Sequence, residues 1–311
     1  MPSWKPALMT LALLTAATAA PAAGDAPPYP PVTDTAHASQ PAAEIFRGFF
    51  SAKSRHQPDA LMDYFARDKV LYIDASSAGI WPSWAALNKI FTTFMPKWPP
   101  SGLSYPTRIY GDEHSALVAF TDTPELFGKE LRILGSVSFG PDGKIVRWID
   151  YWDGRSSLRK NSITPAYPTD FHDNVGNATG RIRDVAAQLS GAFAGGDAKA
   201  AAAMFSNDAV FEDMALHTQI LGRPAIARYL TRALPSLPYG TGSVLAHVVG
   251  SDEGGGYEWL ASQPASAPLK RGNTALELDA TGKISRFTVI YDSNQFPLTT
   301  YQLLVGLAAE Q

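Results

Sequence analysis

The residues best placed to do chemistry are aspartates that end short apolar runs. Residues 70–74 and 209–213 each read as a strand that closes on a carboxylate, Asp74 in the first and Asp213 in the second. A carboxylate at the inner end of an apolar strand is destabilising unless it is hydrogen-bonded, paired or protonated, so its pKa is open to adjustment. Both aspartates are therefore candidate catalytic groups for proton transfer. The alternative for Asp213 is a carboxylate that caps backbone amides or pairs with Arg223.

A third candidate catalytic residue, Asp150, lies near the end of the first half. It alternates with Trp148 and Trp152, so the three side chains share one face of an expected strand. If that face is concave, Asp150 is a second acid in an aromatic pocket and lies opposite Asp74 for paired acid–base work. If it is convex, the tryptophans form an interface and Asp150 is a charge at its rim. Both alternatives stay open at this point.

Aromatic side chains close to these acids are expected to line a binding site. Tyr72 precedes Asp74 by two residues, shares its strand face and can donate a hydrogen bond. His217 follows Asp213 by four residues in an expected loop. Aromatic residues at helical spacing are also typical of a plain core. The expected ligand-binding residues are Tyr72, Trp81, Trp84, Trp148, Phe211 and His217.

Composition narrows the class of protein. The chain has 311 residues, 45% of them hydrophobic and 18% charged, which is typical of two folded domains. A formal net charge of -3 without a basic run gives no footprint for nucleic acid. The absence of cysteine excludes disulfides, thiolate nucleophiles and cysteine-ligated zinc, and the histidines lack metal-ligand spacing. We therefore expect no metal site and no organic cofactor.

The first 23 residues read as a secretion signal peptide. Lys5 supplies the positive charge, and the apolar run that follows is too short to span a bilayer. That length disfavours the alternative, a permanent membrane anchor. Residues 24–42, rich in Pro, Ala and Thr, are expected to form a flexible leader. We expect the mature protein to be exported, to the periplasm or outside the cell, and to have no membrane contact after cleavage.

The rest of the chain repeats one plan twice. The same offset of 139 residues separates Asp74 from Asp213 and Gly143 from Gly282. Each copy reads as helix, helix, strand, helix and four further strands, an α+β unit whose helices cover one face of a curved sheet. In the first copy the four further strands are expected at about 104–110, 115–122, 127–139 and 144–152. Such a sheet curls into a cone with an apolar interior. The predicted segments are a first domain at 43–155, a linker at 156–180 and a second domain at 181–311.

Two runs in the second copy resemble a known family. Residues 203–213 and 221–226 are similar to the ketosteroid isomerase and SnoaL-like polyketide cyclase branch of the nuclear transport factor 2-like (NTF2-like) superfamily. The resemblance covers both copies and implies two tandem cone-shaped domains, each with three helices packed on a strongly curved, mainly antiparallel sheet. It also implies that Asp213, and by position Asp74, is the general base that moves a proton next to a carbonyl.

The isomerases of this family also use two oxyanion donors, a Tyr and a protonated Asp. By position these donors fall near Leu189 and Thr274 in the second copy, and near Phe50 and Gly135 in the first. None of the four is a Tyr or an Asp, and the loss of one such donor typically lowers the rate by about 10²–10³. True ketosteroid isomerase activity is therefore not expected.

Two functions remain open. In the first, the protein binds a small apolar molecule and is a cofactor-independent isomerase, cyclase or lyase (dehydratase), with Asp74 as general base. In the second, the same fold is a non-catalytic module that binds a ligand or another protein. Single domains of this family pair through their sheets, so we expect a monomer whose two copies form a pseudo-dimer within one chain.

Overall fold

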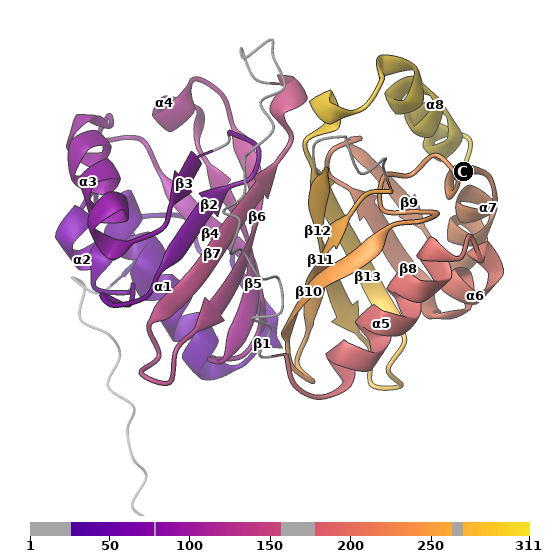
Figure 1. The fold of residues 1–311 in the computed structure, drawn as a ribbon, viewed down its shortest axis with the longest axis horizontal. Coiled ribbons are helices and arrows are strands. Elements are labelled where there is room, and N and C mark those ends of the chain that lie inside the picture. Colours follow the sequence, from indigo (N-terminus) through magenta and orange to yellow (C-terminus); the bar gives the residue numbers. More distant parts are fainter. Residues whose placement is uncertain (1–25, 78, 157–177, 263–269) are drawn as a thin grey trace, which may run out of the picture.

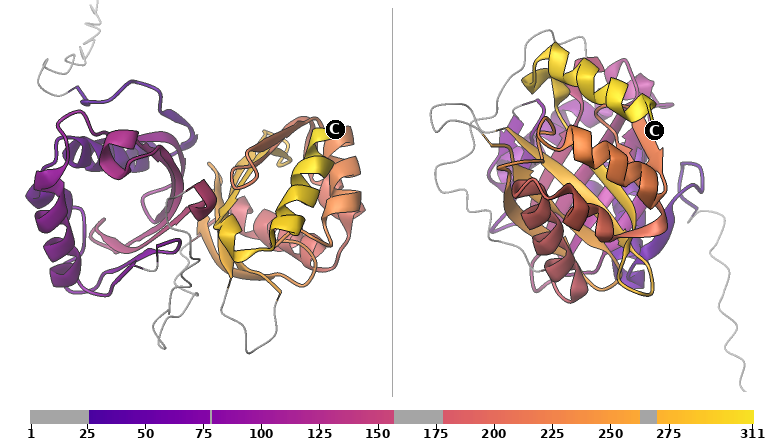
Figure 2. Two further views of the ribbon diagram at one scale, coloured as in Figure 1. Left: turned by 90° about the horizontal axis from the view of Figure 1, so that it is seen from above. Right: turned by 90° about the vertical axis from the view of Figure 1, so that its right-hand side faces the viewer.

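The computed structural model of the protein describes residues 26–77, 79–156, 178–262 and 270–311. Two curved sheets face each other, and the helices cover their outer sides (Figures 1 and 2). The fold is therefore α+β with two curved sheets, as predicted. The expected signal peptide and most of the expected linker lie outside the described residues. Within the described ranges, every helix is too short or too polar to span a bilayer.

The first half of the chain forms one seven-stranded sheet with its helices. Its elements are β1 (Asp34–Ala38), α1 (Gln40–Ser54), α2 (Pro58–Met62), β2 (Leu71–Asp74), β3 (Gly79–Trp81), α3 (Trp84–Phe94), η1 (Met95–Lys97), β4 (Ser104–Gly111), β5 (Ser115–Asp122), α4 (Pro124–Phe127), β6 (Leu131–Phe139), β7 (Ile145–Trp152) and η2 (Gly154–Ser156). The strand order is β1-β4-β5-β6-β7-β2-β3. Pairing is antiparallel except between β1 and β4 and between β2 and β7.

The second half forms a six-stranded sheet on the same plan. Its elements are α5 (Arg181–Ala194), α6 (Ala198–Ala203), β8 (Phe205–Asp213), β9 (Thr218–Leu221), α7 (Arg223–Ala233), β10 (Val244–Gly250), β11 (Gly255–Leu260), β12 (Arg271–Leu278), β13 (Ile284–Tyr291), η3 (Ser293–Gln295) and α8 (Leu298–Ala309). The strand order is β10-β11-β12-β13-β8-β9, and only β8 and β13 run parallel.

The structure differs from the prediction in the segment before the first domain. Residues 24–42 were expected to form a flexible leader, but residues 34–38 form β1, and α1 begins at Gln40. The N-cap of α1 is Ser39, whose Oγ accepts a hydrogen bond from the amide of Ala42 at 3.3 Å. The prediction rested on composition alone, whereas β1 is held by pairing with β4, a contact that local composition does not reveal.

Each half has its own apolar core between its helices and the concave side of its sheet. Phe46, Phe50 and Trp148 belong to the core of the first half, and Phe193 and Phe287 belong to that of the second. These residues come from the apolar stripes of α1 and α5 and from alternate positions of β7 and β13.

A third apolar cluster lies between the two sheets. It joins eight residues of the first half to four of the second: Ile73, Ala75, Tyr110, Leu117, Ala119, Leu134, Ile149 and Tyr151 with Met214, Val249, Ala275 and Ile290. In the same layer, Glu258 is fully buried and accepts hydrogen bonds from Arg147 at 2.5 Å and Tyr151 at 2.6 Å across the interface. Arg271 contacts the same carboxylate at 2.9 Å. The convex faces of the two sheets thus cover each other.

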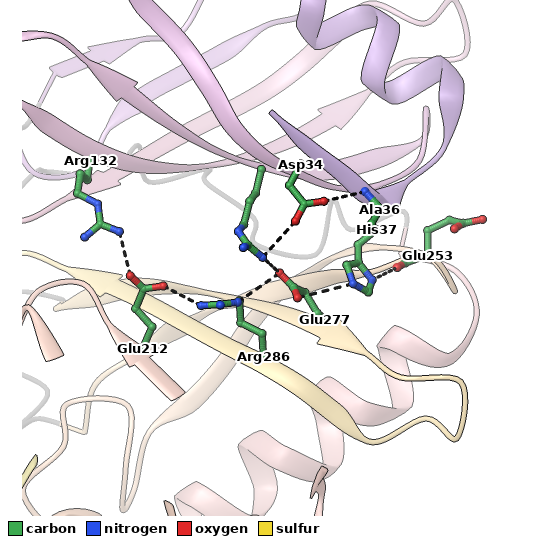
Figure 3. Close-up of polar contacts among 9 residues, drawn as sticks. Asp34, Ala36, His37, Arg132, Glu212, Glu253, Glu277 and Arg286 are labelled. Carbon is green, nitrogen blue, oxygen red and sulfur yellow. Dashed lines mark hydrogen bonds and ion pairs between the residues drawn. The ribbon is translucent and has the colours of Figure 1, made fainter. Parts of the chain in front are cut away.

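A chain of alternating charges also crosses between the halves (Figure 3). Arg132 lies 2.9 Å from Glu212, and Glu212 lies 3.2 Å from Arg286. Arg286 in turn approaches Glu277 at 3.7 Å, and Glu277 pairs with Arg108. From β1, Asp34 lies 3.5 Å from Arg108, and His37 Nε2 lies 3.6 Å from Glu277. These contacts tie the N-terminal strand and both sheets together.

Candidate functional site

Asp150 lies in the interior of the first half, on β7. Its Oδ1 accepts a hydrogen bond from the indole N–H of Trp148 at 2.5 Å, and its Oδ2 accepts one from the Tyr72 hydroxyl. Asp150 is 6% exposed, and this burial raises the pKa of its carboxyl to about 7 against the opposing effects of both donors and of Lys53. The face that carries Trp148, Asp150 and Trp152 is therefore the concave one. Near pH 7 the carboxyl populates both protonation states.

A buried ion pair accompanies this carboxyl. Lys53, on α1, places Nζ 3.2 Å from Oδ1 of Asp122 at the end of β5, and the two side chains are 9% and 5% exposed. The ammonium also lies 4.8 Å from the centre of the Phe120 ring, within cation–π range. Buried charges are tolerated when they are paired, so Lys53 and Asp122 compensate each other. Together they add no net charge to the interior.

Asp74 ends β2 at the half-buried end of the same interior. Its Oδ1 accepts hydrogen bonds from the amides of Ser76 and Ser77, at 3.1 and 2.9 Å, and from the indole N–H of Trp152 at 2.9 Å. Burial raises the pKa of Asp74, while these donors act to lower it. Because each partner donates, the hydrogen bonds favour the ionised carboxylate.

The two carboxyl groups are neighbours on one face. β2 and β7 are parallel neighbours in which Asp74 is in register with Asp150, and Tyr72 with Trp148. Adjacent strands lie about 4.8 Å apart, so the side chains of each pair lie side by side. At the half-buried end of the interior, amides and an indole donate hydrogen bonds to Asp74, whereas Asp150 is more deeply buried. Two acids in different surroundings can hold different protonation states, which paired acid–base chemistry requires.

Gly135, on β6, leaves the space that the Asp150 carboxyl occupies. Gly135 is opposite Asp150 in the sheet, and a β-carbon at Gly135 would lie 3.1 Å from both Asp150 Oδ1 and Trp148 Nε1. The Asp150 carboxyl therefore occupies the space beside Gly135 that a larger residue would fill.

The second half has the same strand register but different residues at the matched interior positions. β13 pairs with β8 as β7 pairs with β2, and the helices of the two halves correspond with an offset of 140 residues, as between Gln57 and Asp197. The polar residues of the first half and their counterparts are Lys53 and Phe193, Tyr72 and Phe211, Asp122 and Ala261, Trp148 and Phe287, and Asp150 and Val289. At these five matched positions the second half carries only Phe, Ala or Val, and its own buried polar groups, Asp213, Tyr239 and Tyr291, lie at other positions.

Solvent access differs between the halves as well. Tyr72, Asp74 and Trp81 are half-buried, whereas their counterparts Phe211, Asp213 and Ile220 are buried. The ring of Phe211 stacks on that of Phe287 at 4.5 Å between centroids. The side chains at the end of β2 are therefore partly exposed in the first half, whereas their counterparts are buried in the second.

Asp213 is fully buried in the second half. Its Oδ1 accepts the amides of Ala215 and Leu216 at 3.1 and 3.0 Å, and its Oδ2 accepts the hydroxyls of Tyr239 and Tyr291 at 3.0 and 3.2 Å. Burial raises its pKa to about 7. A depression beside Tyr291 has room for no more than about one water molecule. Asp213 thus caps two backbone amides, which was one of the alternatives for this residue. Arg223, the other proposed partner, is exposed, whereas Asp213 is buried.

The remaining residues that were predicted to bind a ligand do not all lie together. Tyr72 lies inside as expected, but it donates to Asp150 instead of Asp74. Trp81 packs edge-on against Tyr72 at 5.6 Å. Trp84 donates its indole N–H to the carbonyl of Met62 at 3.2 Å and so joins α3 to α2. His217 is exposed on the turn after β8, with φ of 54°, so it does not share the buried surroundings of Asp213.

Sequence reasoning missed Lys53 and Asp122. The signal for Lys53 was a lysine in the apolar stripe of α1, at helical spacing from Phe46, Phe49 and Phe50. Asp122 gave no such signal, because its partner lies 69 residues away in the sequence. Over the described residues, no three His, Asp or Glu side chains gather as a metal ion would require.

No protein-family model and no curated protein matches the chain. Among solved structures, it is similar to a steroid delta-isomerase from Pseudomonas aeruginosa, with 19% identity over 42% of this chain and 90% of that one and a TM-score of 0.32. It is also similar to a nuclear transport factor 2-like protein from Cytophaga hutchinsonii, with 10% identity over 37% and 91% and a TM-score of 0.31. A protein with a cystatin-like fold from Methylobium petroleophilum gives 13% identity over 42% and 89%, with a TM-score of 0.33. These likenesses decide nothing about the reaction.

Proposed function

We propose that the first half binds a small molecule with an apolar body in its interior and transfers a proton on it without a cofactor. One observation carries this proposal: five neighbouring interior positions are polar in the first half and apolar at every matched position of the second. The second half folds with apolar residues at these five positions, so the fold does not require polar groups there, and buried polar groups are destabilising unless satisfied. Their presence on one side only is typical of a functional site.

The surroundings of the two acids suggest their roles. Asp74 is the general base, because three N–H donors favour its ionised form and because it lies at the half-exposed end. It removes a proton from a carbon next to a carbonyl. Asp150, whose pKa is about 7, donates a hydrogen bond or its proton to the carbonyl oxygen as negative charge develops there. Return of the proton from Asp74 to another carbon completes an isomerisation; cyclisation and dehydration begin with the same step.

Proton transfer at carbon can be tested without knowing the natural substrate. The probe is 2-tetralone in D2O, with exchange at the carbons next to its carbonyl followed by NMR. The wild-type protein should accelerate exchange, and Asp74→Asn should lower the acceleration by about 10²–10⁴, the usual contribution of a general base. Asp150→Val introduces the residue of the second half and should lower it as well. Glu44→Gln, on the exposed side of α1, is the matched control. Equal exchange with wild-type protein and Asp74→Asn would refute the role of Asp74.

A non-catalytic binding module is the second candidate. It is favoured by the amide caps on Asp74 and Asp213, which both halves share and which hold the strand ends irrespective of any reaction. Saturable binding of 2-tetralone without accelerated exchange would support this candidate over the enzyme. We also propose that residues 1–23 direct export, for which the test is N-terminal sequencing of the exported chain.

A further inference from the structure

Two tryptophans flank the Asp74 carboxylate at the half-buried end of the first interior. Trp152 donates its indole N–H to Asp74 at 2.9 Å. On the other side, β3 pairs with β2 so that Gly79 lies directly opposite Asp74. The ring of Trp81 lies over Gly79, since a β-carbon there would be 2.2 Å from the ring. The carboxylate thus has an aromatic ring on each side.

The charged side chains of this interior are compatible with a bound cation. Lys53 is already paired with Asp122. The hydrogen-bond partners of Asp74 and Asp150 are amide, indole and hydroxyl groups, which carry no charge. A positive group near Asp74 would therefore gain a Coulomb interaction in partly desolvated surroundings, where such interactions are stronger than in water.

An ammonium group already lies on one of these rings. Lys129, in the loop before β6, places Nζ 5.6 Å from the centre of the Trp152 ring. This distance is within the range in which aromatic faces attract cations. Burial lowers the pKa of Lys129, while Asp153 and Asp292 act to raise it. The Trp152 ring therefore contacts an ammonium group of the protein itself, the kind of contact proposed here for a ligand.

We propose that the ligand of the first half carries a compact ammonium group, protonated or quaternary, on an apolar body. The ammonium group lies next to Asp74 between Trp81 and Trp152, and the apolar body extends toward Tyr72 and Phe91. This inference rests on the proposed function, because it names the class of molecule that the same interior takes. The second half lacks these features, since Thr218, Ile220 and Tyr291 stand where the first has Gly79, Trp81 and Trp152.

The test compares a cation with an uncharged molecule of the same shape. Phenyltrimethylammonium and tert-butylbenzene differ only in N⁺ against C, and isothermal titration calorimetry of the full chain measures both. The cation should bind at least 10-fold more tightly. Asp74→Asn and Trp81→Leu should each weaken the cation at least 10-fold, and Trp81→Tyr, which keeps an aromatic face, should retain most of the affinity. Glu44→Gln removes one exposed negative charge and should change nothing. Circular dichroism of each variant verifies that it is folded.

The test distinguishes a failure of the ammonium preference from a failure of the proposed binding function. If tert-butylbenzene binds as tightly as the cation, the ammonium preference is refuted while binding of an apolar molecule stands. If neither probe binds, both the inference and the proposed binding function fail. If the cation binds and Asp74→Asn leaves its affinity unchanged, the ammonium group does not lie at Asp74, and the inference is refuted on that ground.

Discussion

Replacing Asp150 by Asn should change how the stability of the protein depends on pH. In the folded protein, burial raises the pKa of Asp150 from its ordinary value of 3.8 to about 7, whereas the unfolded chain keeps the ordinary value. Between these two values the folded state retains a proton that the unfolded state releases, so the free energy of unfolding falls as pH rises. Each pKa unit corresponds to about 1.4 kcal/mol, so the wild-type protein loses about 4 kcal/mol from this group, all of it by pH 8. The Asn variant has no such loss.

Urea unfolding between pH 4.5 and 8.5, followed by circular dichroism, measures this effect. The difference in unfolding free energy between the wild type and Asp150→Asn reports on Asp150 and its coupling to the neighbouring Asp74, because contributions from Asp213 and other distant carboxyls cancel. Over this range the wild type should lose about 3 kcal/mol relative to the variant. Asp59→Asn, on the exposed surface of α2, is the matched control and should follow the wild-type profile. A relative change below about 1 kcal/mol, or one in the opposite direction, would refute the argument that Asp150 is held in a desolvated interior.

Two further predictions concern the interface between the halves. Glu258→Gln should lower the free energy of unfolding by about 3–5 kcal/mol, because Arg147 and Arg271 would stay buried without their carboxylate; urea denaturation at pH 7 measures this, and a loss below about 1 kcal/mol would contradict it. The mature protein should be a monomer in light scattering, because the two convex sheet faces already cover each other. A dimer that persists at micromolar concentration would show that another surface associates.

Hydrophobic periodicity and the constant offset of 139 residues between the two copies were enough to predict most of the fold. The strands expected at 104–110, 115–122 and 144–152 correspond to β4, β5 and β7. The strand expected at 127–139 begins at Leu131, because Pro124 to Phe127 form the short helix α4. β3 and β9 were missed because three- and four-residue strands carry little periodicity of their own and depend on pairing with β2 and β8. The leader was misjudged for the same reason, since β1 depends on a contact with β4.

Side-chain alternation predicted which site residues share a strand face, but it did not predict their contacts. Alternation placed Trp148, Asp150 and Trp152 on one face, and only the curvature of the sheet decided that this face is concave. The partner of Asp150 depends on packing: Tyr72 donates across strands to Asp150, 78 residues away, instead of to Asp74 on its own strand. The Gly135 position shows the same limit, because the sequence does not reveal that the Asp150 carboxyl of the neighbouring strand packs against it.

The alternation of β7 links the interface to the site. Trp148, Asp150 and Trp152 face the interior, while the intervening Ile149 and Tyr151 pack against the second half, with Tyr151 bound to Glu258. A slip of one residue in the pairing of β7 would move every one of these side chains to the opposite face. The register of the site is therefore fixed by contacts with the second half as well as by the first half's own core. The sheet of the second half thus helps to hold β7 in the register that places Asp150 beside Asp74.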